Sequence, residues 1–236
     1  MAAGPSPLSL SIDVARAEVF RMLGYRGREP SEEVVACLDA LWADAEGLVD
    51  ARGVQATVTR ADAEAFGMPN PTETVGIGVV TLGPALEARI AHHQAADEAL
   101  EAFLLDAFGT VAVTAAVEAL VQHLCALATL RGCHPSPRTS PGYGPWDLVH
   151  QPTLLAHLPL KSVGISLTSG SMMVPQKSLS FGLRFHAGPA ADTAWKRGCA
   201  RCGLADCRTR YGGLKGRQRA QYSHRSGSRA RSRRRL

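Results

Sequence analysis

Residues 178–185 read Ser-Leu-Ser-Phe-Gly-Leu-Arg-Phe, the clearest period-two pattern in this chain of 236 residues. Large apolar side chains at Leu179, Phe181, Leu183 and Phe185 alternate with small or polar ones. Successive side chains of a β-strand point to opposite faces, so the pattern predicts a strand that is buried on one face only. Half-buried strands of this kind are typical of antiparallel sheets.

Shorter apolar runs predict the other strands. Residues 53–60 favour one strand, and Val75-Gly76-Ile77-Gly78-Val79-Val80 favours a buried one that leads into a helix. Two more strands are expected over 163–168 and 172–174. Gly76-x-Gly78 lacks the third glycine and the acidic partner of a dinucleotide fingerprint, so we assign it no cofactor role.

Helical spacing dominates the first half of the chain. Apolar residues predict a short helix over 13–23 and a second helix that Ser31 caps at its N-terminus. Two long helices are expected over 84–107 and 110–130, separated at Gly109. The predicted fold class is therefore α+β, with long helices packed on a small, mostly antiparallel twisted sheet and a short helix around residues 154–158.

Composition restricts the class of protein. A hydrophobic content of 45% can fill a core, and we find no run of eighteen apolar residues that would indicate a membrane span. Residues 1–12 lack the basic start and apolar centre of a secretory signal. Six cysteines without such a signal indicate a reducing compartment, so we expect a cytoplasmic protein.

The basic charge is concentrated at the C-terminus. The net charge is +5, but nine of the 26 Lys and Arg residues lie in 211–236, where there is no acid, so the other 17 are outnumbered by 21 acidic residues. The body is mildly acidic, and nothing in it suggests nucleic acid as a partner. We expect a disordered N-terminus over 1–10, a folded domain over 11–190, a cysteine-rich segment over 191–210 and a disordered basic tail over 211–236.

A loop motif carries the main functional signal. Arg138-Thr139-Ser140-Pro141-Gly142-Tyr143-Gly144-Pro145 holds two prolines and two glycines, so it predicts a turn or loop. Arg138 offers a planar fork of donors that suits a carboxylate or phosphate held at two points, and Tyr143 would be displayed at the bend. From these residues alone, a surface turn with a solvated arginine is the favoured interpretation, because loop motifs this short often match by chance.

Further short motifs follow in a distinctive order. Arg-x-x-x-Gly-Tyr at 138–143 precedes Gly-Ile-Ser-Leu-Thr at 164–168, Ser-Met-Met-Val-Pro at 171–175 and Lys-Ser-Leu-Ser at 177–180. With Val-Glu-Ala-Leu at 117–120, this order resembles the activation domain of cobalamin-dependent methionine synthase. The resemblance extends over residues 10–187, and its specific part is 114–186.

The resemblance implies a role in reactivating an oxidised corrinoid. In that family the domain binds S-adenosylmethionine and docks over the corrin. An electron and the sulfonium methyl group then return inactive cob(II)alamin to methyl-cobalamin. The resemblance implies that Arg138 clamps the methionyl carboxylate, that Glu118 faces the cationic end of the ligand, and that Tyr143 faces the corrin as the catalytic residue. Gly142, Gly144 and Pro145 would shape the adenosyl pocket.

Two departures from the family pattern limit the activity of this chain. Gly132 stands where the family has a second cleft acid, and no Asp-x-His-x-x-Gly motif for corrinoid binding is present. The chain is also too short for homocysteine or folate modules. We therefore expect a stand-alone subunit that belongs to a methyltransferase system without being self-sufficient, and that acts with an electron donor on a separate methionine synthase or related corrinoid protein.

A cysteine cluster follows the expected domain. Cys199, Cys202 and Cys207 have a spacing that favours a zinc or iron–sulfur site, and nearby Arg and Lys would lower the thiol pKa values. Three close ligands leave one position open, for which Cys133, a partner protein or a labile ligand are the candidates. This segment is absent from the activation domain of long methionine synthases and resembles short, stand-alone members of the superfamily.

Two other functions remain as alternatives. One is a scaffold protein that carries a metal cluster and docks a corrinoid partner without using S-adenosylmethionine. The other is a nucleic-acid-associated metal protein, whose DNA binding would depend steeply on salt and on the tail over 211–236.

Overall fold

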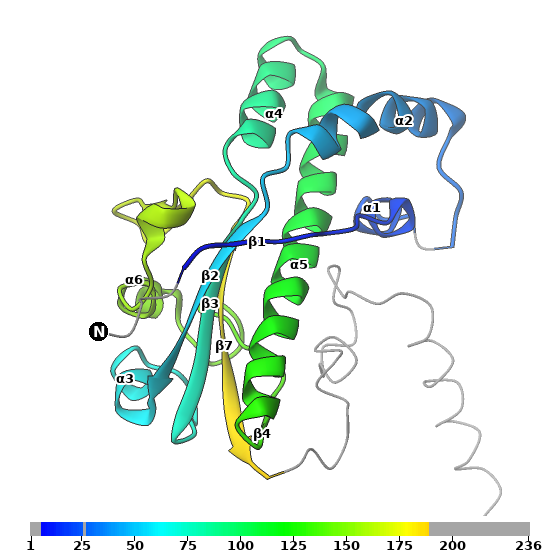
Figure 1. Ribbon diagram of the computed structural model, residues 1–236. Coiled ribbons are helices and arrows are strands. Elements are labelled where there is room, and N and C mark those ends of the chain that lie inside the picture. Colours follow the sequence, from blue (N-terminus) through cyan, green and yellow to red (C-terminus); the bar gives the residue numbers. More distant parts are fainter. Residues whose placement is uncertain (1–5, 26, 189–236) are drawn as a thin grey trace, which may run out of the picture.

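The computed structural model describes residues 6–25 and 27–188. At its centre is an antiparallel sheet of five strands in the order β1-β2-β3-β7-β4 (Figure 1). The strands are β1 (Leu8–Ser9), β2 (Arg52–Thr59), β3 (Thr74–Thr81), β7 (Ser178–Ala187) and β4 (Cys133–Pro135). The central pair, β3 and β7, joins Thr74 to Phe185 and Thr81 to Ser178 in a continuous register.

Helices cover both faces of this sheet. On one face lie α1 (Arg16–Met22), α2 (Glu32–Gly47), α4 (Ala85–Ala95) and the long α5 (Ala99–Leu130). The other face carries α3 (Arg60–Ala65), the 3-10 turns η1 (Leu148–His150) and η2 (Leu160–Val163), α6 (Gln151–Leu155), and a two-stranded ribbon of β5 (Ser166–Leu167) and β6 (Met173–Val174). The α+β class predicted from the sequence is confirmed, and Ser31 accepts a hydrogen bond from the Val34 amide as the predicted cap of α2.

Glycines bring α5 close to the sheet. A Cβ added at Gly76 would lie 2.6 Å from the Phe185 ring, and one at Gly78 would lie 2.8 Å from the Phe181 ring. Both glycines lie on the face that packs against α5, where they make room for the two rings and for leucines of the helix. Gly76 and Gly78 therefore have a packing role.

The second face of β7 is more buried than its alternating pattern predicts. Ser180 is only 2% exposed, and its buried hydroxyl donates to Gln151 Oε1 at 2.9 Å. Gln151 in turn donates to the carbonyl of Ser171 at 2.6 Å. Ser180 and Gly182 are thus covered on this face, and the expectation of a solvent-facing side is wrong for them, whereas His186 at the end of the strand is exposed.

The predicted break at Gly109 is also wrong. α5 continues through this residue for 32 residues, and the real break is a turn at 96–98 between α4 and α5, where Asp97 has a φ of +61°. A Cβ at Gly109 would lie 2.9 Å from Leu86, so the glycine permits the close approach of α4 to α5. Tertiary packing outweighs the helix-propensity cost of glycine, about 1 kcal/mol.

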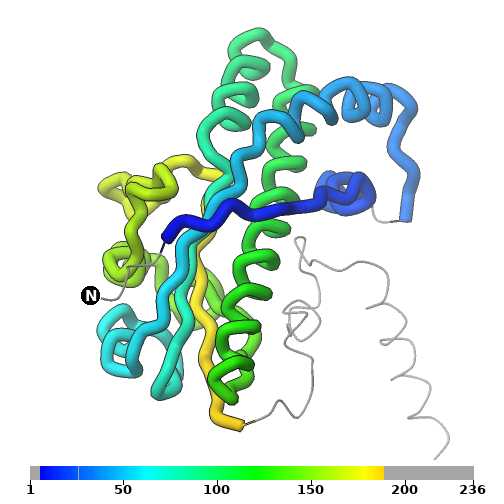
Figure 2. The backbone as a smooth tube through the Cα atoms, viewed as in Figure 1, coloured from blue at the N-terminus to red at the C-terminus, as the bar shows by residue number. Residues whose placement is uncertain are grey.

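The N-terminal segment is partly ordered, contrary to expectation. Leu8 and Ser9 form β1, which pairs with Gly53 and Arg52 at the edge of the sheet. Figure 2 shows the chain running from this edge strand to α1, which packs beside α5. The prediction of disorder over 1–10 fails for these residues because β2 offers them an open edge.

The apolar helix α5 has the length and composition of a membrane span, although the sequence showed no run of eighteen apolar residues. However, 67% of its apolar window is buried inside the protein by the sheet and by α1, α2 and α4. Cys125 lies in this buried part, where burial and then the charge of Glu118 raise its pKa to about 12. These features are those of a core helix.

Candidate functional site

The loop motif begins along the edge of β7 that pairs with β4. Pro135 pairs with Phe185, and Thr139 pairs with Gly182. The two positions are four residues apart on the loop segment but only three residues apart on β7. The segment from Pro135 to Thr139 therefore contains one extra residue, which is the definition of a β-bulge. The bulge shifts side-chain alternation by one position, so that Arg138 turns toward α5.

On that face Arg138 meets Glu118, the acid predicted to share its site. The Arg138 Nε atom lies 3.7 Å from Glu118 Oε1, which is an ion pair and too long for a good hydrogen bond. The two side chains are 23% and 24% exposed. Burial raises the pKa of Glu118 above its ordinary value, and the nearby guanidinium offsets part of this rise.

The pair has unused hydrogen-bonding capacity. Within the described residues, the structure gives the Arg138 guanidinium no hydrogen-bond acceptor at short distance. A guanidinium has five N–H donors, and a carboxylate has about four lone-pair sites. Both groups can therefore accept a further polar partner without losing an established one.

A tight turn follows and displays Tyr143. The amide of Gly142 donates to the Trp146 carbonyl at 2.8 Å, and the amide of Tyr143 donates to the Ser140 carbonyl at 3.1 Å. Gly142 and Gly144 have φ values of +84° and +62°, a backbone region that favours glycine. Tyr143 is 66% exposed at the tip of this turn.

Trp146 anchors the turn to the protein. It is completely buried, stacks on Phe66 with ring centroids 6.0 Å apart, and donates from Nε1 to the Phe66 carbonyl at 3.1 Å. The sequence analysis missed this residue, although a tryptophan directly after a Gly-Pro turn is a recognisable anchor. It also missed Ser140, whose hydroxyl is buried and has no hydrogen-bond partner among the described residues.

The structure brings together some of the predicted site residues. Arg138 and Glu118 form a pair, whereas Gly142, Gly144 and Pro145 belong to the exposed turn with Tyr143. No hydrogen bond or ion pair of the described residues connects the Tyr143 side chain to Arg138 or Glu118. Any ligand shared by the pair and the turn would have to bridge them.

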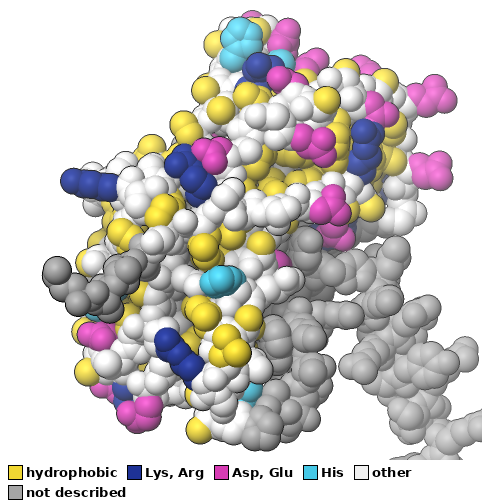
Figure 3. All heavy atoms as spheres, viewed as in Figure 1, with side chains coloured by type: hydrophobic (Ala, Val, Ile, Leu, Met, Phe, Trp, Pro, Cys, Tyr) yellow, Lys and Arg dark blue, Asp and Glu magenta, His cyan; other side chains and the backbone are white. Residues whose placement is uncertain are grey.

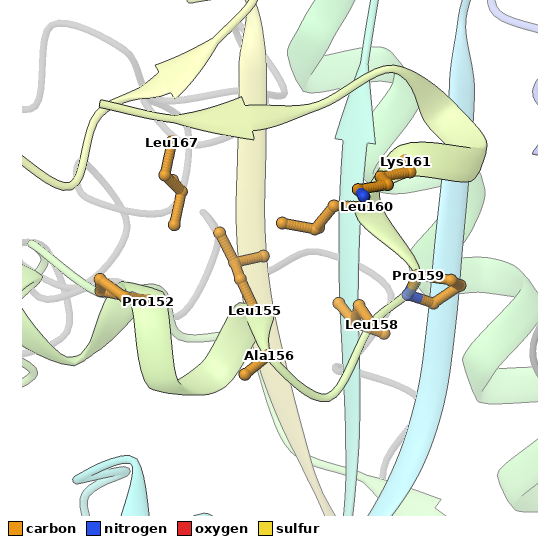
Figure 4. Close-up of a pocket in the computed structure, with 8 residues that line it drawn as sticks. All are labelled: Pro152, Leu155, Ala156, Leu158, Pro159, Leu160, Lys161 and Leu167. Carbon is orange, nitrogen blue, oxygen red and sulfur yellow. The ribbon is translucent and has the colours of Figure 1, made fainter. Parts of the chain in front are cut away.

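Two hollows among the described residues lie elsewhere. One, of about 530 Å³, is open and mostly apolar, and residues of α6, η2 and β5 surround it (Figure 4). The other, of about 350 Å³, lies between the N-terminal segment and the end of α2, and Asp13, Glu46 and Asp50 are among its lining residues. Neither includes Arg138, Glu118 or Tyr143 in its lining.

The predicted metal ligands Cys199, Cys202 and Cys207 lie outside the described residues. Within the described ranges, no group of three or more His, Cys, Asp or Glu side chains converges as a metal site. Cys133 starts β4, and its side chain packs against the core on the α5 side. On the face shown in Figure 3, Lys and Arg side chains are scattered among acidic ones and do not form a continuous basic patch.

Comparisons with known proteins give a likeness in structure but none in sequence. No family model matches the chain, and no curated protein matches its sequence. Among solved structures, it is similar to the crystal structure of the MetH reactivation domain bound to AdoHcy, with 16% identity and a TM-score of 0.48. The match covers 80% of this chain and 83% of that chain.

Proposed function

We propose that the protein is an S-adenosylmethionine-binding reactivation subunit. It supports reductive methylation of cob(II)alamin on a separate cobalamin-dependent methionine synthase or a related corrinoid protein, and we expect it to work in the cytoplasm. The observation that carries the proposal is the half-buried pair of Arg138 and Glu118 beside the turn that displays Tyr143.

The charges of this pair match an amino-acid zwitterion. The methionyl end of S-adenosylmethionine has a carboxylate for Arg138 and an ammonium group for Glu118. The pair is loose at 3.7 Å, so a ligand that enters between the two groups exchanges one weak contact for two charge-assisted hydrogen bonds. The sulfonium charge adds to the attraction of Glu118. A purely anionic ligand would satisfy Arg138 but not Glu118.

Tyr143 has the exposure that a docking residue requires. In the proposed reaction, an external donor reduces Co(II) to Co(I), whose electron pair attacks the sulfonium methyl carbon. The C–S bond breaks with its electrons on sulfur, which leaves S-adenosylhomocysteine and methyl-Co(III). The contribution of this chain is to position the methyl group over cobalt. Tyr143, 66% exposed on a rigid turn, would contact the corrin.

Calorimetry tests the ligand site directly. The full-length protein is expected to bind S-adenosylhomocysteine, and Arg138→Ala to weaken binding on the order of 10- to 100-fold, since hydrogen bonds to charged groups contribute about 1.5–3 kcal/mol each. Arg131→Ala, an exposed arginine at the end of α5, is the matched control and should bind like the wild type. No binding by the intact protein would favour the scaffold alternative.

Reconstitution tests the reaction. A methionine synthase that lacks its activation module is mixed with this protein, S-adenosylmethionine and an electron donor, and the methyl-cobalamin spectrum is followed. Tyr143→Ala should reduce the rate of reactivation while leaving ligand binding nearly unchanged, because the residue is exposed in the free protein. Full activity of Arg138→Ala at limiting ligand would contradict the proposal.

A further inference from the structure

A row of polar side chains runs along one side of α5, next to the edge of the sheet that holds the loop motif. Its members recur at every fourth residue, namely Asp106, Thr110, Thr114 and Glu118. Residues four apart lie on the same side of an α-helix. At one end of the row the Lys177 ammonium donates to Thr110 Oγ1 at 3.0 Å. At the other end Arg138 pairs with Glu118, so Thr114 lies between two polar contacts of α5 with the sheet.

Ser140 lies on the α5 side of the loop motif, as Arg138 does. Thr139, between them, pairs with Gly182. A Cβ at Gly182 would lie 3.4 Å from Trp146, so Thr139 belongs to the face that Trp146 occupies. Successive side chains of an extended chain alternate between faces, so both neighbours of Thr139 turn toward α5. This places Ser140 roughly 6.5 Å from Arg138 along the edge.

The polar side chains continue beyond the ion pair in one direction. Helix α5 and strand β7 run the same way, because the residue before β7 contacts the first half of α5 and the end of β7 lies near Leu124. The loop motif pairs antiparallel with β7, so it runs against α5. Ser140 follows Arg138 in the motif, whereas Thr114 precedes its neighbour in the row by one turn. Both hydroxyls are therefore displaced from the ion pair toward the same end of the sheet.

Two buried serines differ in their hydrogen bonds. Ser180 is 2% exposed and donates to Gln151 Oε1 at 2.9 Å. Ser140 is 4% exposed, and its hydroxyl has no hydrogen-bond partner among the described residues. Thr114 has spare capacity as well, since its hydroxyl donates to the Thr110 carbonyl at 2.8 Å and keeps its acceptor sites. Buried polar groups are normally paired, so an unpaired hydroxyl beside a candidate site points to a contact that a ligand makes.

We propose that Ser140 and Thr114 bind a ribose hydroxyl of S-adenosylmethionine. The inference rests on the proposed function, which assigns the methionyl carboxylate to Arg138 and the ammonium group to Glu118. The methionyl chain links those groups to the ribose, so a ligand that extends from the ion pair past Ser140 brings its ribose to the two hydroxyls. A hydroxyl both donates and accepts, so the ribose accepts from Ser140 and donates to Thr114.

The Ser140 hydroxyl is covered in the structure, so entry of the ligand requires a side chain to move. Arg138 is two residues away on the same face, and its ion pair with Glu118 is loose at 3.7 Å. Rotation of the guanidinium toward the ligand carboxylate opens the way to the hydroxyl as the ligand arrives. The hydroxyl is therefore a cost to the free protein and a contact in the complex.

Ser140→Ala should change stability and ligand binding in opposite senses. In the free protein it removes a buried hydroxyl that has no described partner, so the urea midpoint of the full-length chain should rise by roughly 0.3–1 M. In the complex it removes a hydrogen bond, so calorimetry should show S-adenosylhomocysteine binding weakened roughly 3- to 10-fold. Thr114→Val, which keeps the branched shape, should weaken binding to a similar degree.

Ser180→Ala is the matched control. It also removes the hydroxyl of a buried serine, but it breaks the bond to Gln151, so the urea midpoint should fall while S-adenosylhomocysteine binds as it does to the wild type. An S-adenosylhomocysteine analogue that lacks the ribose hydroxyls identifies the ligand atom. It should bind the wild type and Ser140→Ala equally well, because the contact is absent from both complexes.

Different results would overturn this inference and the proposed function. Wild-type affinity in Ser140→Ala, together with loss of binding in Arg138→Ala, would refute the ribose contact and leave the reactivation function in place. A lower urea midpoint in Ser140→Ala would show that the hydroxyl is already satisfied in the free protein, for example by a buried water. An equal loss of affinity for the analogue in Ser140→Ala would place the contact elsewhere on the ligand. Failure of the wild type to bind S-adenosylhomocysteine would refute both proposals.

Discussion

The two faces of the central sheet are covered in different ways. On one face, the long helix α5 packs directly on the sheet at Gly76 and Gly78, α1, α2 and α4 pack around it, and the contacts are apolar and close. On the other face, several short elements surround Trp146, and buried polar groups such as Ser180 and Gln151 hydrogen-bond between them. The first face is one rigid unit, and the second is assembled from separate pieces.

The candidate site takes one part from each face. Glu118 belongs to the rigid helix, whereas Tyr143 is displayed by a turn anchored in the assembled face through Trp146. Arg138 lies between them, on the bulged edge of the sheet. Close packing of α5 therefore holds Glu118 in place, whereas the position of Tyr143 depends on Trp146 alone.

Removal of that anchor should have the largest effect on stability. Trp146→Ala deletes a completely buried side chain that stacks on Phe66 and donates to its carbonyl, and such deletions cost about 3–5 kcal/mol. Urea unfolding followed by circular dichroism measures the loss. Tyr143→Ala in the same turn is the control, and it should change the free energy of unfolding by no more than about 0.5 kcal/mol. A cost below about 1 kcal/mol for Trp146→Ala would show that the assembled face does not depend on this anchor.

The rigid face should be sensitive to added volume. In Gly78→Ala the new methyl would lie 2.8 Å from the Phe181 ring, which is completely buried and cannot move away freely. Overpacking of this kind costs about 1–3 kcal/mol. The cost should fall in a Phe181→Leu background, which removes the ring tip, and a double-mutant cycle by urea unfolding measures that coupling. Gly47→Ala, with open space around it, should not destabilise the protein, and equal costs at both glycines would contradict the packing argument.

Local sequence signals predicted the elements whose structure is determined by residues close to them in the sequence. The alternation over 178–185 located β7, the serine before two glutamates located the start of α2, and the apolar run at 75–80 located β3. These signals depend on periodicity and capping, which act over a few residues. The loop character of 138–145 followed in the same way from its glycines and prolines.

The errors arose where distant parts of the chain determine local structure. Gly109 stays helical because α4 packs against it, and Leu8 becomes a strand because β2 has an open edge. The bulge that turns Arg138 toward Glu118 appears only when Pro135 and Thr139 are paired with β7. Pro137, which has no amide proton for a sheet ladder, was the available signal for that bulge.

The smallest expected effect is the pH dependence of stability that comes from the partly buried Glu118 on α5. The folded-state pKa of Glu118 lies above its ordinary value, so the folded protein holds this proton more tightly than the unfolded chain does. Stability from this group is present at acidic pH and is lost as pH rises from the ordinary glutamate range through the raised pKa. Urea unfolding of Glu118→Gln across this range should therefore show stability relative to the wild type that increases with pH and then levels off. Arg138→Gln should steepen the loss with rising pH, since the guanidinium offsets part of the shift, and a difference between Glu118→Gln and wild type that is constant with pH would contradict the burial of this carboxylate.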